Sequence, residues 1–362
     1  MKIIQGIKML MFRFKKILLE FVAFVLFYSR TLTLFNHFVN GFQSKKNDNG
    51  KFRFPYVKRR HSRNIQILVY HRVNDEQDPF FPATPVKIFG RQMDYLASHF
   101  NVLDLDEAIE RLKKKDVIEN AVVITFDDGY KDNYVIVFPI LKRLSIPVTI
   151  FLPTASIGSE KPLWHDRVFS AFRNTQVSVL RNFSNSSKVY PLGTTKEKIS
   201  SLREVSKFLW SLDNDERSLW IDRLIKQLGV SDESAVEPLL TWDDVKEMHQ
   251  NGISFGSHTV THSILSRLPL DEVKAEVYES KKIIEEKIGS PVRTFAYPVG
   301  RKEDFNEITK NLLKEAGYTC ALTTIFGAND DQQDLFELRR GMPWEEYLPA
   351  FVAKMNWYKF YY

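Results

Sequence analysis

The sequence predicts an α/β fold in which short parallel strands alternate with amphipathic helices around a sheet or barrel. Three observations predict it: brief apolar runs that recur along the chain, helical periodicity between them, and polar motifs directly after several of the runs. This alternation is typical of βα units. With 362 residues, 44% of them hydrophobic, the chain can bury a substantial core.

Six apolar runs are the predicted strands, at residues 65–69, 122–126, 148–152, 253–255, 294–296 and 318–322. Helices are expected between them. The stretch 271–288 repeats apolar residues at helical spacing and stops at Gly289, a common helix terminator, and the stretch 305–316 stops in the same way at Gly317.

Residues between the strand at 148–152 and Trp242 contain no predicted strand but have helical periodicity from about 202 to 228. We therefore expect a helical insertion at about 156–240, on the face of the sheet where the loops emerge. The resulting division of the chain is an N-terminal arm at 1–63, a barrel at 64–345 and a C-terminal tail at 346–362.

Charge is distributed unevenly along the chain. The net charge is +6, but residues 1–63 hold 14 Lys and Arg against 2 Asp and Glu, which leaves the rest of the chain mildly acidic. We therefore do not expect a basic groove for nucleic acid on the folded body. The single cysteine, Cys320, excludes a disulfide framework and a cysteine-rich zinc site.

The arm contains an apolar run at residues 17–28, interrupted by Glu20 and flanked by Lys and Arg. The run is short for a bilayer span and is not followed by a small-residue cleavage site. Three alternatives stay open: a helix lying on anionic lipid, an uncleaved signal anchor, or a helix packed on the body. We expect association with a membrane of the cell envelope; positive residues on both sides of the run leave the side of the membrane open.

Two motifs follow predicted strands directly. Asp127, Asp128 and Gly129 come after residues 122–126; alone, this triplet is typical of a turn or a helix cap. His258 and His262 come after residues 253–255, and on a helical turn this spacing would let both imidazoles share one metal ion. Such a pair also arises by chance in a chain with eight histidines, but both motifs fall where a parallel barrel builds active sites.

Two further strand ends carry polar or rigid residues. His71 follows the first strand, and Tyr297 and Pro298 follow residues 294–296. A lone histidine at such a position is more often structural than catalytic. Four strand ends of this kind together favour one active site at the carboxyl edge of the sheet.

The segments TFDDGY at 125–130, HTVTH at 258–262 and FAYPVG at 295–300, in this order, resemble the motifs of the polysaccharide deacetylase family, carbohydrate esterase family four. The resemblance covers roughly residues 64–345. It implies a distorted (β/α) barrel with one divalent metal ion, most often Zn²⁺, that hydrolyses acetyl groups on sugars. By motif position Asp128, His258 and His262 would bind the metal, and Asp127 would be the general base.

Physical chemistry agrees with these roles. Three protein ligands leave a coordination position open for water, and the cation both acidifies that water and polarises the acyl carbonyl. An amide nitrogen leaves poorly as an anion, so a proton donor is also needed, and histidine suits this task.

The sequence departs from the family pattern in two places. The family's acid is a histidine near the carboxyl end, but this chain has no histidine after His262; residues 68–71 have the form of that motif at the amino end, as in the circularly permuted branch, so His71 is the expected acid. The arginine that normally orients the base is also missing from residues 296–299. Arg340 is the expected replacement, with Arg72 and Arg293 as alternatives.

Sugar contacts are expected from residues beside these motifs: Tyr130, Trp164, Tyr297 and Pro298. His165 and Asp166, next to Trp164 where the insertion begins, are further candidates to line the sugar cleft. Trp164 is equally a candidate for the core. The sequence thus predicts a membrane-associated, metal-dependent hydrolase that removes N-acetyl groups from amino sugars of a polysaccharide or lipid-linked glycan. The alternatives are a deformylase or O-acetyl esterase on the same scaffold, and an inactive carbohydrate-binding module.

Overall fold

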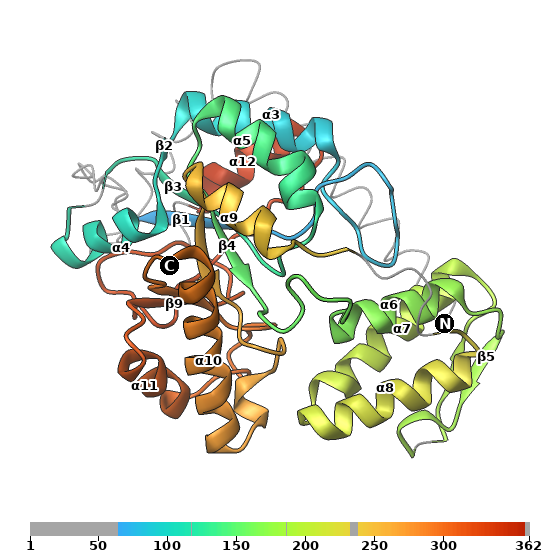
Figure 1. Ribbon diagram of the computed structural model, residues 1–362. Coiled ribbons are helices and arrows are strands. Elements are labelled where there is room, and N and C mark those ends of the chain that lie inside the picture. The colour runs from blue at the N-terminus through green and yellow to red at the C-terminus, as the bar shows by residue number, and fades with distance from the viewer. Residues whose placement is uncertain (1–63, 117, 186, 232–237, 359–362) are drawn as a thin grey trace, which may run out of the picture.

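The computed structural model describes residues 64–116, 118–185, 187–231 and 238–358 (Figure 1). The N-terminal arm expected at residues 1–63 lies outside the described residues. Among the residues described, no helix is both long and apolar enough to cross a membrane.

A parallel seven-stranded sheet forms the centre of the molecule. The strand order is β1-β3-β4-β7-β8-β9. The short strand β2 pairs with the first residues of β3, and β4 pairs with the last residues of β3 along the same edge. The six predicted strands are confirmed, and β2 is additional. The bounds are β1 (Ile65–Tyr70), β2 (Asn101–Val102), β3 (Ala121–Phe126), β4 (Thr149–Leu152), β7 (Ser254–Ser257), β8 (Thr294–Ala296) and β9 (Cys320–Leu322).

The sheet curls and is closed by a segment that is not itself a strand. Leu338 forms a parallel bridge with Leu322 of β9, and Gly341 forms one with Leu68 of β1. The Gly341 N–H donates to the Ile67 carbonyl at 2.7 Å. Residues 338–341 therefore join the last strand to the first, and the predicted distorted (β/α) barrel is confirmed.

Alternation along the strands separates two cores. Ala121 and Val123 of β3 belong to an inner cluster that also contains apolar residues of the helix following β2. Val122, Ile124 and Phe126 belong to the larger cluster between the strands and the surrounding helices. Because side chains alternate between the faces of a strand, the next inward positions on β3 are Thr125 and Asp127. The register of the strand thus directs a carboxylate into the carboxyl end of the barrel.

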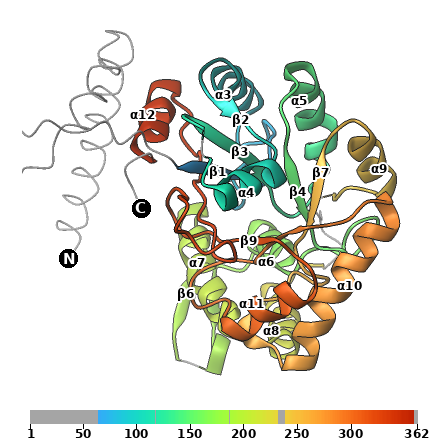
Figure 2. The same cartoon turned by 90° about the vertical axis from the view of Figure 1, so that its left-hand side faces the viewer.

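Helices surround this barrel (Figure 2). The helix at 271–288 is confirmed within one residue, and the helix at 305–316 begins two residues late, because the Asn306 side chain caps it by accepting a hydrogen bond from Thr309 N. The helices are α3 (Val86–His99), α4 (Leu105–Lys114), α5 (Phe138–Leu144), α9 (Trp242–Gln250), α10 (Leu270–Ile288), α11 (Glu307–Glu315) and α12 (Leu348–Tyr358), with short helical turns at Asn133–Val137, Phe183–Asn185 and Leu265–Arg267. The region expected as a C-terminal tail contains α12, whose Phe351, Val352 and Met355 are buried in the main core.

Between β4 and α9 the chain forms a lobe beside the barrel (Figure 1). Its elements are α6 (Trp164–Asn174), β5 (Val179–Arg181), β6 (Val189–Pro191), α7 (Thr195–Trp210) and α8 (Asn214–Leu228), which bury a hydrophobic cluster of their own. The expectation of no strand here is wrong, because β5 and β6 form an antiparallel pair. The periodic stretch at 202–228 is two helices, and Asp213 caps the second by accepting a hydrogen bond from Glu216 N.

Gly256 in β7 lies where the barrel leaves no room for a side chain. A Cβ atom there would overlap the Phe151 ring and lie 2.7 Å from Thr294 Oγ1. We expect Gly256→Ala to lower the free energy of unfolding by about 1–3 kcal/mol, measured by urea denaturation, because both neighbours are packed in the core.

Gly90 in α3 provides the matched control, since a Cβ atom there would have nothing within 4 Å. Gly90→Ala should raise the free energy of unfolding by about 0.5–1 kcal/mol through helix propensity. Equal effects of the two substitutions would contradict the packing described for β7.

Candidate active site

Two adjacent carboxylates leave the end of β3 in different directions. Asp128 has φ +73° and Gly129 φ +68°, so the chain turns sharply in the left-handed region. A Cβ atom at position 129 would lie 2.8 Å from Leu152 Cδ2 and 2.9 Å from Ile157 Cδ1, so glycine is required there. Left-handed backbone at a residue such as Asp128 is strained, and strain of this kind is concentrated at functional sites.

Asp127 forms a buried bidentate ion pair with Arg340. Arg340 Nη1 and Nη2 donate to the two Asp127 carboxylate oxygens, both at 2.8 Å, and Arg340 Nε donates to the Thr323 carbonyl at 2.7 Å. The Arg340 side chain is fully buried. Burial acts to raise the pKa of Asp127, but the Arg340 guanidinium outweighs it and holds that pKa below the ordinary value.

The two alternative arginines lie elsewhere. Arg293 is on the surface with an ion pair to Asp106, and Arg72 lies over the rings of Phe81 and Tyr130. Arg340 is thus the arginine of the three that contacts Asp127. It reaches the site because residues 338–341 close the barrel between β9 and β1.

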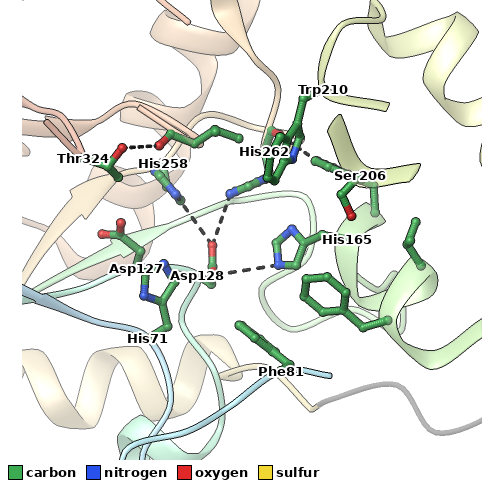
Figure 3. A pocket seen from close by; sticks show the side chains of 14 residues that line it. His71, Phe81, Asp127, Asp128, His165, Ser206, Trp210, His258, His262 and Thr324 are labelled. Atoms are coloured by element: carbon green, nitrogen blue, oxygen red, sulfur yellow. Dashed lines mark hydrogen bonds and ion pairs between the residues drawn. The ribbon is translucent and has the colours of Figure 1, made fainter. Parts of the chain in front are cut away.

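Asp128 faces the two histidines of the second motif (Figure 3). Its Oδ1 lies 3.2 Å from His262 Nε2 and 3.6 Å from His258 Nε2, and all three side chains are buried. One potential ligand atom from each residue lies within 4.8 Å of the others. The expected helical turn is wrong: residues 258–262 form a loop with φ +68° at Thr259 and +58° at His262, which brings the two imidazoles together.

The donor atoms of this cluster fit a divalent cation. His258 Nδ1 lies 2.7 Å from the Ala296 carbonyl, so Nδ1 carries the proton and Nε2 directs a lone pair toward Asp128. Burial lowers the pKa of His258 to about 4, which keeps the ring neutral at neutral pH. Asp128 Oδ1 is buried and accepts no hydrogen bond. Two imidazoles and one carboxylate that converge in a buried site offer a divalent cation three ligand atoms, and this set suits Zn²⁺.

Glu276 of α10 holds the loop that carries the two histidines. Its carboxylate accepts hydrogen bonds from Val260 N at 2.7 Å, Thr261 N at 3.0 Å and Thr261 Oγ1 at 2.6 Å. Sequence analysis missed this residue, because nothing in the helical pattern of α10 distinguishes it from the other glutamates on that helix.

These residues open into one pocket of about 180 Å³ between the barrel and the lobe. His71 follows β1 and lines this pocket with Asp127 and Asp128, close enough to favour the charged form of both carboxylates. The other lining residues are Phe81, Trp164, His165, Val168, Phe169, Ser206, Trp210, His258, His262, Val299 and Thr324.

Of the four residues expected to contact sugar, Trp164 lines the pocket. Its indole N–H donates to the His262 carbonyl at 3.3 Å, and the Arg217 guanidinium lies 4.9 Å from the ring centre. Trp164 is therefore both a wall of the pocket and a contact between the lobe and the loop at 258–262.

The other three residues are not among those that line the pocket. Tyr297 is buried in the main core, stacks on Phe305 and donates its hydroxyl to the Phe336 carbonyl at 3.1 Å. Pro298 is buried, and the next residue, Val299, lines the pocket instead. Tyr130 is 1% exposed and lies behind the pocket.

The lobe also supplies His165, which the sequence placed with Trp164 and Asp166 as a candidate to line the sugar cleft, and which does line the pocket. Tyr130 donates its hydroxyl to Asp166 Oδ1 at 3.0 Å, and the Tyr130 hydroxyl oxygen lies 3.0 Å from His165 Nε2. Burial lowers the pKa of His165 to about 3, so its imidazole is neutral. The sequence signal was the Trp-His-Asp triplet at 164–166, where the lobe begins.

Comparison with known proteins gives the family. The profile of the polysaccharide deacetylase family matches residues 114–321, more than half of the chain. The chain belongs to the polysaccharide deacetylase family. Both His71 and Arg340 lie outside the matched range, so their place beside the motifs comes from the fold.

Individual proteins agree with this assignment. YxkH of Bacillus subtilis (strain 168), named as a polysaccharide deacetylase, is 25% identical over 300 residues, which cover 82% of this chain and 76% of YxkH. Two solved structures share the fold. The Streptococcus pyogenes deacetylase PplD, in complex with acetate, has a TM-score of 0.54 at 20% identity, and IcaB from Ammonifex degensii has 0.53 at 18%; each match covers 81% of this chain and 97% of the other.

Breaking the buried pair should be costly for stability. Arg340→Met leaves an ionised carboxylate buried without its cation, and we expect the free energy of unfolding to fall by about 3–5 kcal/mol, measured by urea denaturation. The double variant Arg340→Met with Asp127→Asn should recover much of this loss, because it removes the charge as well.

Lys302 provides the control, since its side chain is 68% exposed and pairs with Glu337. Lys302→Met should change the free energy of unfolding by less than about 1 kcal/mol. If Arg340→Met lowers the free energy of unfolding no more than Lys302→Met does, then Arg340 is not needed to neutralise the buried Asp127 carboxylate.

Proposed function

We propose that this protein is a metal-dependent hydrolase that removes N-acetyl groups from amino sugars of a polysaccharide or lipid-linked glycan. The observation that carries the proposal is one pocket in which an Asp-His-His cluster lies beside a second carboxylate held by a buried arginine. Membership of a family of carbohydrate deacetylases supports the reaction class.

The residues divide the work as follows. Asp128, His258 and His262 would hold the cation, which when bound supplies Lewis-acid polarisation of the acyl carbonyl and activation of water. Asp127 accepts the proton of the attacking water. Arg340 keeps Asp127 ionised and fixes both its oxygens, so the carboxylate is oriented before the substrate arrives.

His71, which follows the first strand of the barrel, donates the proton that the leaving nitrogen needs. Water adds its oxygen to the carbonyl carbon, the carbon-nitrogen bond breaks, and acetate and an amine are formed. The leaving nitrogen takes a proton from His71, because an amide nitrogen does not leave as an anion. Support for this role comes from the position of His71 after β1 and its closeness to both carboxylates.

A sugar substrate is supported by the aromatic character of the pocket wall. Trp164, Phe169 and Trp210 of the lobe line the pocket together with Val299 and Thr324 of the barrel. Aromatic rings offer the apolar face of a sugar a stacking surface, while the carboxylates and imidazoles reach the acylamino group.

We also propose that residues 1–63 associate the protein with a membrane surface in the cell envelope. The support is the excess of Lys and Arg in this arm together with the apolar run at 17–28. A lipid-linked or surface glycan would then be held near the pocket.

Substitutions can distinguish a metal ligand, Asp128, from the proposed general acid, His71. Asp128→Asn should lose bound metal and acetate release together. His71→Ala should keep its metal and lose roughly 10² to 10⁴ in rate, because a general acid is worth about that much. Metal content is measured by mass spectrometry of the purified proteins, and acetate release on N-acetylglucosamine oligosaccharides.

His249→Ala is the matched control, since this histidine bonds Ser290 and the Ile253 carbonyl away from the pocket. It should keep both metal and activity. Loss of metal in His71→Ala, or near-normal turnover of the amide, would remove His71 from the mechanism; release of formate rather than acetate from acylated sugars would favour the deformylase alternative.

Removal of residues 1–45 should separate location from catalysis. We expect unchanged turnover of soluble oligosaccharide and a sharp fall in co-sedimentation with vesicles containing anionic phospholipid, measured on the same preparation. Equal co-sedimentation of the full and shortened chains would contradict the proposed role of the arm.

A further inference from the structure

His165, the second residue of α6, is a buried histidine that the proposed chemistry does not use. Three oxygen atoms surround its Nε2: the Tyr130 hydroxyl at 3.0 Å, Asp166 Oδ1 at 3.6 Å and Asp128 Oδ2 at 3.8 Å. Tyr130 donates its single hydroxyl proton to Asp166. The Tyr130 oxygen must then accept from His165, so Nε2 carries a proton.

This arrangement defines the other ring nitrogen as an acceptor. A neutral imidazole has one donor and one acceptor nitrogen, so His165 Nδ1 presents a lone pair. Figure 3 shows this nitrogen on the side of the pocket near Ser206 and Trp210. Among the described residues, no group donates a hydrogen bond to it. Because the nitrogen nearest Asp128 is protonated, His165 does not serve as a fourth metal ligand in this arrangement.

The wall around this acceptor is largely apolar. The lobe contributes Trp164, Val168, Phe169 and Trp210, and the polar groups it adds beside His165 are the Ser206 hydroxyl and the two indole N–H groups. An acceptor in such a wall loses hydration when a ligand enters, and that loss is offset only if the ligand brings a donor.

We propose that His165 is a substrate-contacting residue whose Nδ1 accepts a hydrogen bond from a ring hydroxyl of the amino sugar. This inference rests on the proposed deacetylation and adds a specificity contact to it. A sugar hydroxyl can donate to His165 and receive from Ser206, while its ring packs on the aromatic wall. Tyr130 and Asp166 are positioning residues, because they fix the tautomer of the imidazole without lining the pocket.

The test compares substrates that differ by one hydroxyl. N-acetylglucosamine oligosaccharides lacking the C3 or the C6 hydroxyl on the acetylated residue are assayed with the zinc-loaded full chain. For the wild type, one deoxy compound should have kcat/KM lower than the parent by roughly three- to tenfold, the effect of one hydrogen bond. In His165→Ala that ratio should move toward one, with unchanged zinc content, because the contact with His165 is lost while a contact with Ser206 can stay. His165→Asn should restore part of it, because the amide oxygen can accept in place of Nδ1.

Val168→Ala is the matched control, one turn away on the same helix and without a polar atom in the pocket. It should change kcat/KM for the parent and both deoxy compounds by the same factor. A wild type that deacetylates the parent but does not distinguish the deoxy compounds would overturn the assignment of His165 alone, as would loss of zinc or an equal effect on all substrates in His165→Ala. A wild type inactive on every compound would overturn the proposed function and this contact with it.

Discussion

An ionised carboxylate inside a barrel requires a cation to neutralise it. In this chain the buried ion pair between Asp127 and Arg340 meets that requirement, and the rest of the site is built around it. Asp127 is the next inward position of β3, and its charge is matched by Arg340, which no solvent reaches. Since Arg340 belongs to the segment that bridges β9 and β1, the same segment closes the barrel and neutralises Asp127. The remaining polar groups of the site are arranged around this fixed pair.

The alternation of side chains between the two faces of each strand explains which of the predicted residues lie in the site. His71 continues the inward positions Ile65 and Ile67 of β1. At β8 the inward position is Ala296. Phe295 and Tyr297 face the other way and pack in the main core between the sheet and the helices. A tyrosine beside a motif is therefore no guide to the pocket until its register is known.

Sequence reasoning succeeded where a local pattern has one structural outcome. The six strands were predictable because each is a short, mainly apolar run followed within two residues by a polar residue, glycine or proline. The loop at 258–262 was not, because its shape depends on Glu276, which is distant in sequence. The β5–β6 pair was missed because its strands are three residues long and lack a regular alternation of apolar side chains. Contributions of the lobe to the pocket depend on how α6 and α7 pack against the barrel, which periodicity alone does not define.

We propose that the Asp-His-His cluster, with Asp127 beside it, hydrolyses an acylated amino sugar by means of one bound metal ion. The most direct measurement is titration of the chelated full-length protein with Zn²⁺ while acetate release from N-acetylglucosamine oligosaccharides is followed. We expect negligible acetate release without metal and a rise that levels off at one equivalent of Zn²⁺ per chain. Undiminished acetate release from the chelated protein would contradict it.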